Sequence, residues 1–305
     1  MKKILLGNAA VARGAYEAGA NLVSSYPGTP STEITESVTE YSEIYCEWAP
    51  NEKVAAEVAI GASIGGARAM SCMKHVGLNV MADPIFTVSY TGVNGGLVFC
   101  VADDPGMHSS QNEQDSRHYA KAAKMPMLEP SDSSECKEYV KLAFELSEKY
   151  DAPFFIRLST RVSHSQSLVE LQDRENVELK PYEKNIGNYV MMPANAIKRH
   201  VVVDERTKAL TEYAENCAIN AIEDNGSDIG VITSGISYMY AKEALGEKVN
   251  FLKLGMVYPL PEKLIVDFAA KCGKVYVIEE LDPFIEEHCK ALGIEVIGKD
   301  AFTLL

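Results

Sequence analysis

The stretch WAPNEKVAAEVAIGASIGGARAM, residues 48–70, places one carboxylate, Glu52, at the front of a long run of small and apolar residues. Pro50 and Asn51 stand just before it, and both residue types are common where a helix begins. An acidic side chain suits this position because it lies near the positive end of the helix dipole. The stretch therefore predicts a closely packed helix that begins near Glu52. It leaves open whether Glu52 only stabilises the helix or takes part in chemistry.

Short apolar runs alternate with helical patterns on both sides of this stretch. In the first part of the chain the candidate strands are KKILLG, NLVSSYP, SCMKHV, LVFCVAD, MPMLEP and PFFIRLS. Such continuously apolar runs are typical of strands that are covered on both faces. We expect the first of them, residues 3–6, to be a buried strand. The regular succession of strand and helix predicts an α/β fold with a doubly wound parallel sheet.

The chain divides into two units of this kind. Residues 1–165 form the first unit. Residues 166–224 are polar, charged and poor in strand signals, so we expect a linker that becomes a connecting helix near its end. The strand and helix patterns resume in residues 225–305 with DIGVITSG, VNFLKLG and KVYVIEEL. We therefore expect a second, smaller α/β domain there.

Composition excludes several classes of function. The 305 residues are 47% hydrophobic and 24% charged, as in ordinary globular proteins, and the formal net charge is −14. This acidic balance argues against nucleic acid as a partner, and no apolar run reaches the ~18 residues of a membrane span. The seven cysteines include no CxxC pair, which disfavours zinc ribbons and iron–sulfur repeats. We expect a cytoplasmic protein with no nucleic-acid partner, no membrane contact and no metal site in this chain.

Polar loops follow several candidate strands, and ligands bind beyond the carboxyl ends of strands in such sheets. In YPGTPSTEI, Thr29 follows a stiff turn, and Ser31 or Thr32 is expected to cap the next helix. In MKHVGLN, Lys74 and His75 follow a strand directly, although a lone histidine is more often structural. The long polar loop at residues 101–120 is suited to binding a ligand, or is simply a solvated loop.

The chain resembles the alpha subunits of indolepyruvate:ferredoxin oxidoreductases, which belong to the thiamine diphosphate-dependent 2-oxoacid:ferredoxin oxidoreductases. The strings that carry the resemblance run almost from end to end: LLGNAAVARGAYEAG, YPGTPSTEI, NEKVAAEVAIGASIGGARAMSCMKHVGLN, DPIFTVSYTGVNGGLVFCVADDPGMHSSQNEQDSRHYAKAAKMP, TRVSHS, TSGISY, LKLGMVYPLPEKL and EELDPFIEE. The resemblance implies that residues 1–165 are a pyrimidine-binding domain of a thiamine diphosphate enzyme. It also implies that residues 225–305 are a transketolase C-terminal-like domain.

The resemblance assigns roles to residues in these loops. Glu52 matches the family's glutamate that hydrogen-bonds N1′ of the thiamine pyrimidine, so it is expected to be catalytic and cofactor-binding. Thr29 matches the family's substrate-facing threonine. The further cofactor-binding candidates are Gly28, Lys74 and Gly77, and the further substrate-binding candidates are His75, His108 and Asn112. Pyruvate-specific relatives hold the substrate carboxylate with an arginine after the fourth strand. This sequence has aspartates there and Arg117 further on, so the carboxylate-binding residue stays open.

The implied reaction is oxidative decarboxylation of indolepyruvate and related aryl pyruvates to an acyl-CoA, with ferredoxin as electron acceptor. The expected partners are a second copy of the chain in a homodimer, a smaller beta subunit, ferredoxin, the 2-oxoacid and CoA. The family's magnesium–diphosphate signature, GDG followed by Asn, is absent from the sequence, and so are cluster-binding cysteines. We therefore expect Mg²⁺ and iron–sulfur clusters only in a missing C-terminal part. The chain would be the front half of an alpha subunit, engineered or naturally split, and inactive alone.

Two other interpretations of the same residues stay open. The chain could be a non-catalytic assembly or cofactor-binding module, because it lacks the diphosphate anchor. It could also serve another thiamine diphosphate 2-oxoacid enzyme built on the same scaffold.

Overall fold

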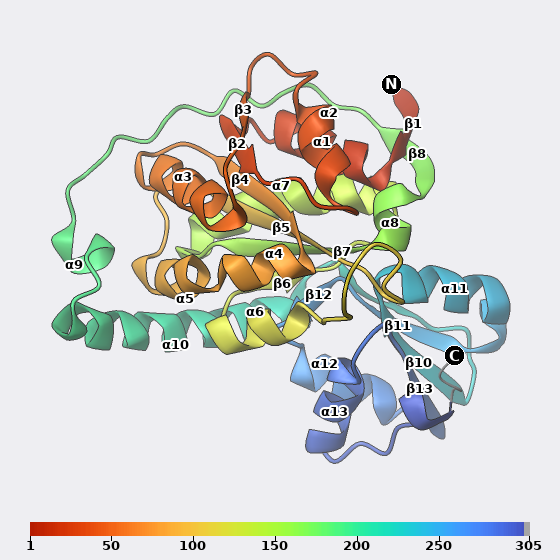
Figure 1. Cartoon of the computed structure of the whole chain (residues 1–305). Helices are drawn as coiled ribbons and strands as arrows, with labels where there is room; N and C mark the ends of the chain where they lie inside the picture. Colours follow the sequence, from red (N-terminus) through yellow and green to blue (C-terminus); the bar gives the residue numbers. More distant parts are fainter. Residues whose placement is uncertain (302–305) are drawn as a thin grey trace.

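The computed structural model describes residues 1–301 of the chain. Figure 1 shows a large N-terminal unit with a central sheet between helices, and a smaller C-terminal unit below it. The strands are β1 (Lys2–Leu6), β2 (Leu22–Ser25), β3 (Tyr45–Trp48), β4 (Ala69–Lys74), β5 (Leu97–Asp103), β6 (Met127–Leu128), β7 (Phe154–Ser159), β8 (Gln166–Glu170), β9 (Asn220–Glu223), β10 (Ile229–Ser234), β11 (Asn250–Leu254), β12 (Met256–Tyr258) and β13 (Lys274–Ile278).

Helices connect most of these strands. They are α1 (Gly7–Glu17), α2 (Thr32–Val38), α3 (Glu52–Ile64), α4 (His75–Val80), α5 (Ala82–Thr91), α6 (Arg117–Ala123), α7 (Ser133–Tyr150), α8 (Thr160–His164), α9 (Ile186–Tyr189), α10 (Pro193–Asn216), α11 (Gly235–Leu245), α12 (Glu262–Ala269) and α13 (Phe284–Ala291). Two short 3₁₀ turns lie at Gly246–Lys248 and Lys299–Ala301.

The central sheet of the N-terminal unit has the strand order β12-β6-β7-β5-β4-β2-β3. All of its neighbouring pairs are parallel except β12 with β6, which is antiparallel. Every residue of β4, β5 and β7 is buried. The doubly wound parallel sheet predicted from the continuous apolar runs is therefore confirmed.

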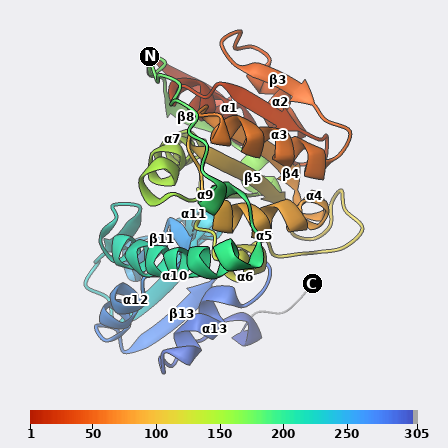
Figure 2. The ribbon, with the colours of Figure 1, turned by 90° about the vertical axis from the view of Figure 1, so that its left-hand side faces the viewer.

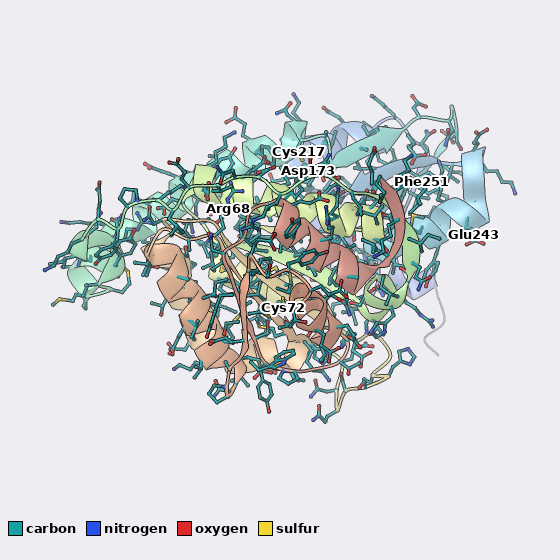
Figure 3. All side chains as sticks on the ribbon, turned by 90° about the horizontal axis from the view of Figure 1, so that it is seen from above. Arg68, Cys72, Asp173, Cys217, Glu243 and Phe251 are labelled. Atoms are coloured by element: carbon teal, nitrogen blue, oxygen red, sulfur yellow. The ribbon has the colours of Figure 1, made fainter. Side chains whose placement is uncertain are left out.

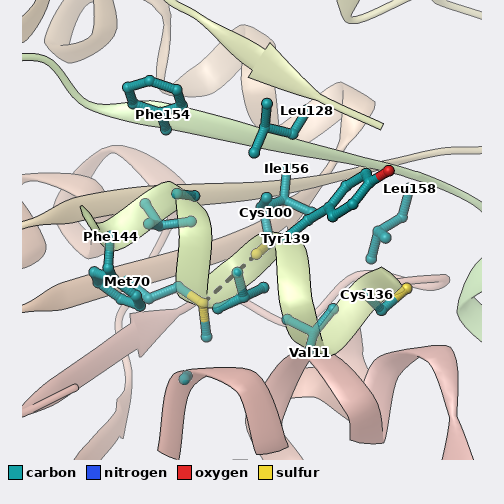
Figure 4. Packing of buried hydrophobic residues seen from close by; sticks show 14 of the residues in the cluster. Val11, Met70, Cys100, Leu128, Cys136, Tyr139, Phe144, Phe154, Ile156 and Leu158 are labelled. Carbon is teal, nitrogen blue, oxygen red and sulfur yellow. Dashed lines mark hydrogen bonds between the residues drawn. The ribbon is translucent and has the colours of Figure 1, made fainter. Parts of the chain in front are cut away.

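Two hydrophobic layers cover the two faces of this sheet. In β5, alternate residues pack into one layer or the other. Val98, Cys100 and Ala102 pack with α1, α2 and α7, while the intervening residues pack on the opposite face with α3, α4, α5 and α6. Successive residues of a strand point to opposite faces, so a strand covered on both sides must be apolar throughout. Figure 4 shows the first layer, with the Cys100 thiol 3.5 Å from the sulfur of Met70.

The C-terminal unit is a four-stranded sheet in the order β13-β10-β11-β9, parallel except for β9. It shares a hydrophobic core with the N-terminal unit, because Ile232 and Leu252 belong to the same buried cluster as Phe99 and Phe155. The strand β12 also crosses over to pair with β6 of the large sheet. The two units are thus joined by both packing and strand pairing.

The connection between the units follows a long path. After β8 the chain runs along the top of the N-terminal unit to α9, and α10 returns beneath it (Figure 1), as the turned view also shows (Figure 2). The Arg206 guanidinium on α10 donates to the carbonyl oxygens of Asp151 and Ser89, which ties the helix to the first unit. The strand β9 lies within the range 166–224 predicted as linker, yet it pairs with β11.

Two expectations about strands were wrong. Residues 3–6 do form part of a strand, but β1 pairs with β8 in a separate two-stranded sheet, and Ile4 is exposed. The physical reason is that Lys2 and Lys3 would be costly to bury in a sheet covered on both faces. The strand β3 was missed because YCEW carries a glutamate and is short, features that an edge strand tolerates.

All seven cysteines are free thiols. Figure 3 labels two buried ones, Cys72 in β4 and Cys217 directly after α10. Burial raises the pKa of the Cys100 thiol well above its usual value. Among residues 1–301, no helix combines the length and apolar character that crossing a membrane would require.

Candidate functional site

The helix α3 begins where the sequence predicted. Asn51 has extended backbone angles, and its side-chain oxygen accepts a hydrogen bond of 3.0 Å from the Val54 N–H. This N-cap hydrogen bond fixes the residue at which the helix begins. Glu52 is therefore the first residue of the helix and is only 8% exposed, whereas Glu57, one turn further on, is exposed.

The Glu52 side chain rests on α4. A Cβ atom at Gly77 would stand 2.5 Å from its Oε1 and 2.7 Å from its Cγ, so the carboxylate occupies the space that a side chain at position 77 would need. In the described part of the chain, no hydrogen bond reaches the Glu52 carboxylate. The carboxylate therefore has no partner within the described residues and is available to a ligand at this edge of the sheet.

The turn after β2 lies beside the same strand ends. The Ser31 hydroxyl donates 2.8 Å to the Gly28 carbonyl oxygen, and the Thr32 hydroxyl accepts 2.8 Å from the Gly28 N–H. Neither hydroxyl caps α2, so the predicted cap was wrong: both hydroxyls close the turn instead. Gly28 faces Lys74, because a Cβ there would lie 3.0 Å from the Lys74 Cδ. Thr29 is exposed at the tip of this turn.

The residues at the end of β4 hold the loop that follows β5. The Lys74 ammonium donates 2.7 Å to the carbonyl oxygen of Ser109, and His75 Nε2 lies 3.1 Å from the carbonyl oxygen of Asn112. A carbonyl oxygen only accepts hydrogen bonds, so Nε2 carries the proton and Nδ1 is left as an acceptor. That Nδ1 is buried and has no partner among the described residues. Burial lowers the pKa of His75, which favours the neutral ring.

The structure separates the two remaining candidates from this group. The Asn112 side chain points to the exterior, where its oxygen accepts from Gln114 Nε2 at 2.8 Å, and only its backbone contacts His75. His108 lies instead in a cavity of about 470 Å³ whose wall also contains Arg161, His164 and Tyr240. The sequence offered one signal for this cavity, since TRVSHS directly follows an apolar strand.

A buried network of charges lies between β5, β6 and β7. Arg157 is 1% exposed and donates 2.8 Å to Asp103; it also pairs with Glu129 and lies 3.8 Å from Asp115. Burial raises the pKa of Asp103 to about 6, against the opposing effect of the Arg157 guanidinium. This network was not foreseen from the sequence, because its members are far apart along the chain.

Arg117, the only basic residue noted as a possible anchor for the substrate carboxylate, belongs to this network. It is fully buried, and its guanidinium pairs with Asp115 and with Glu279 at 2.5 Å. Glu279 follows β13, so the pair ties the C-terminal unit to the carboxyl edge of the large sheet. Arg117 thus has carboxylate partners within the protein and is not free to bind a substrate.

The sequence and the fold of this chain are similar to those of known proteins. A family model described as pyruvate flavodoxin/ferredoxin oxidoreductase, thiamine diphosphate-binding, matches residues 13–227. The indolepyruvate oxidoreductase subunit IorA of Archaeoglobus fulgidus is 46% identical over 312 residues, covering 98% of this chain and 50% of that protein. The chain spans about half the length of the curated relatives it matches.

Solved structures share the fold at low sequence identity. A 2-oxoglutarate:ferredoxin oxidoreductase from Magnetococcus marinus superposes with a TM-score of 0.81 at 20% identity, covering 98% of this chain and 62% of that chain. A split-gene transketolase gives a TM-score of 0.60 at 17% identity, with 96% and 86% coverage. The fold is thus shared with a transketolase as well as with an oxidoreductase, as the family resemblance implied.

The class that this fold defines is that of the thiamine diphosphate-type α/β proteins, with a doubly wound unit followed by a smaller α/β unit. Within that class, the chain belongs to the pyruvate flavodoxin/ferredoxin oxidoreductase, thiamine diphosphate-binding family. The predicted resemblance to the alpha subunits of indolepyruvate:ferredoxin oxidoreductases is confirmed.

Proposed function

We propose that this chain is the pyrimidine-binding half of the alpha subunit of an indolepyruvate:ferredoxin oxidoreductase. The complete enzyme would convert aryl pyruvates to acyl-CoA with ferredoxin as electron acceptor, as a dimer that also contains a beta subunit. The similarity to IorA subunits supports this reaction class.

The proposal rests on the close contact between the Glu52 side chain and Gly77. Glu52 is 8% exposed and leads α3, and its carboxylate meets no donor in residues 1–301, so it is free to hydrogen-bond a heterocyclic nitrogen. Gly77 removes the side chain that would displace this carboxylate. The residues present therefore fit the pyrimidine ring of thiamine diphosphate, which when bound supplies the electron sink for decarboxylating a 2-oxoacid. Glu52 would hold the proton shared with the ring N1′.

Other groups at the same edge have complementary tasks in this proposal. His75 presents an unpartnered Nδ1 acceptor, and Lys74 fixes the loop after β5 through Ser109. Thr29 would direct its hydroxyl to the 2-oxoacid from the turn after β2. Lys74 and His75 stand at the end of β4 and Thr29 follows β2, so neighbouring strands of the parallel sheet contribute to one site.

Apolar side chains surround this edge in a way that supports a larger assembly. Four of them are each at least 40% exposed: Tyr26 after β2, Trp48 at the end of β3, Val80 on α4 and Phe86 on α5. Exposed large apolar side chains in one region mark interaction surfaces. The only group of potential metal ligands in the described residues is Asp115, His118 and Asp282, and Asp115 already pairs with Arg117. We infer that the cofactor's diphosphate and Mg²⁺ are held outside residues 1–305, so that these residues alone do not turn over.

The test is the Glu52→Gln substitution in the enzyme reconstituted with its remaining half and the beta subunit. Glutamine keeps the shape but cannot exchange a proton with N1′, so viologen reduction with indolepyruvate and CoA should fall by about 10²- to 10⁴-fold. Glu57→Gln, an exposed acid on the same helix, is the matched control and should leave turnover unchanged. Near-normal turnover of the Glu52 variant at saturating cofactor would reduce Glu52 to a helix-end acid.

A further inference from the structure

A cavity of about 470 Å³ lies at the carboxyl edge of the large sheet, next to the site described above. Its wall is formed by His108 from the loop after β5, by Thr160, Arg161 and His164 of α8 with the adjoining Ser165, and by Ile236 and Tyr240 of α11. Figure 1 shows α8 and α11 one above the other on the same side of the molecule. The volume is within the range of small-molecule sites, roughly 300–1,000 Å³.

Arg161 is the one permanent positive charge in this wall. Its side chain is exposed and forms no ion pair or hydrogen bond with the described residues. The two histidines add donors without adding a fixed charge: His164 Nε2 lies 3.7 Å from Glu33, and the His108 ring lies over Gly106. The Thr160 hydroxyl is already engaged, because it donates 2.7 Å to Asp104. The guanidinium of Arg161 is therefore available to an anion.

Hydrogen bonds and close polar contacts connect the cavity to the proposed catalytic edge on two sides. On one side, Glu33 is near His164 and accepts 3.1 Å from the Asn8 amide, which also donates 2.7 Å to the carbonyl oxygen of Pro30, the residue after Thr29. A ligand in the cavity would thus lie beside the turn that carries Thr29.

On the other side, the loop after β5 forms a common wall. Asp104 accepts from the Thr160 and Ser110 hydroxyls and from the Ser109 N–H, while the Ser109 carbonyl oxygen accepts from Lys74. One face of the loop therefore contacts the Lys74 side of the proposed cofactor site, and the other bears His108 in the cavity.

The remaining wall is apolar and comes from the C-terminal unit. Ile236 is 8% exposed and Tyr240 is 50% exposed, so both offer surface against which a ring can pack. An aromatic ring stacked on a tyrosine contributes beyond the burial of its area. A cavity with one guanidinium at one wall and a tyrosine at another suits an aromatic body that carries a single carboxylate.

We propose that Arg161 binds the carboxylate of the aryl 2-oxoacid while Tyr240 and Ile236 receive its ring. The identity of the ligand rests on the proposed function. A planar guanidinium holds a carboxylate through two parallel hydrogen bonds, and Arg117 and Lys74 are engaged elsewhere. CoA is a poorer match, because several phosphate charges would face only one permanent cation.

The test titrates the whole chain with indole-3-propionate, an unreactive aryl carboxylate, and with its neutral counterpart indole-3-propanol. Arg161→Gln should weaken binding of the propionate by about 10- to 100-fold, the effect of losing a hydrogen bond to a charged group, and should leave the weaker binding of the propanol unchanged. Lys198→Gln, which removes an exposed cation on α10, should change neither affinity. Because Arg161 is exposed, the Arg161→Gln variant should keep the melting temperature of the unchanged chain.

Other results would overturn this assignment. Equal affinity of the propionate for the Arg161→Gln and unchanged chains would exclude the arginine, and absence of propionate binding to the unchanged chain would exclude the cavity. If Arg161→Gln instead lost binding of CoA and kept binding of the propionate, the arginine would be assigned to a phosphate group. The titration needs no turnover, so an Arg161-dependent carboxylate site beside normal turnover of Glu52→Gln would uphold the carboxylate site while removing Glu52 from the chemistry.

Discussion

The Glu52 carboxylate lies in the space that a side chain at position 77 would fill, 2.5 Å from where a Cβ of Gly77 would stand. The two residues come from the starts of different helices, α3 and α4, which follow strands on either side of β2 in the sheet order. The glycine and the glutamate therefore act as a unit: the absence of one side chain sets the position of the other.

Gly77→Ala should consequently affect the function of Glu52 more than the fold. The added Cβ cannot coexist with the present Glu52 rotamer, so the Glu52 side chain must take another one. We expect turnover of the reconstituted enzyme to fall at least 10-fold. The free energy of unfolding should change by less than about 1 kcal/mol, since alanine favours the helix by roughly that amount. Thermal unfolding and viologen-linked turnover measure the two quantities.

Gly61→Ala is the matched control, because it lies within α3 and a Cβ there would meet nothing within 4 Å. It should raise the free energy of unfolding by about 0.5–1 kcal/mol without changing turnover. If both glycine variants kept full turnover, the close contact between Glu52 and Gly77 would not be needed for catalysis.

Thr29→Val tests the exposed hydroxyl at the turn after β2. No hydrogen bond occupies that hydroxyl in the described structure, and the turn is closed by Ser31 and Thr32 instead. The variant should keep its melting temperature, and kcat/KM for the 2-oxoacid should fall about 10- to 100-fold, as for a lost bond of roughly 1.5–3 kcal/mol to a charged partner.

Thr32→Val provides the contrast, because its hydroxyl accepts from the Gly28 N–H. Its free energy of unfolding should fall by about 1 kcal/mol, and its kinetic change should be smaller than that of Thr29→Val. The reverse pattern, with Thr29→Val unstable but kinetically normal, would make Thr29 a turn residue alone.

Arg157→Met tests the buried charge network. Removing this guanidinium leaves Asp103 and Glu129 without their main cation, and breaking such a buried pair costs about 3–5 kcal/mol. Without the cation, the pKa of Asp103 in the folded state should rise further above its unfolded value. The folded state then binds more protons than the unfolded state, so the variant should lose stability as the pH rises through that pKa.

Urea denaturation at pH 5 and pH 8 measures this effect, with Lys53→Met as control. Lys53 pairs with Asp83 at 3.1 Å on the surface, and such pairs contribute at most about 1 kcal/mol. An Arg157 variant no less stable than the Lys53 variant would show that the network contributes little to folding.

The sequence by itself determined the fold class, because the signals for it are local. The runs that became β5 and β7 are apolar at every position, which only a sheet covered on both faces can accommodate. Asn51 likewise predicted where α3 begins, since its cap bond reaches only three residues ahead. The family resemblance pointed to Glu52, which the structure places at the carboxyl edge of the sheet.

The tertiary structure alone decided which strand belongs to which sheet and which loops meet. Residues 3–6 read as a buried strand, yet their lysine neighbours place them in the separate pairing with β8. Arg161 and Tyr240 share a cavity only because the C-terminal unit folds back on the carboxyl edge of the first. Such contacts join residues far apart along the chain, and they depend on the packing of whole elements instead of on any local pattern. For this reason the Arg161 cavity and the Arg157 network could not be predicted, whereas the sheet that positions them could.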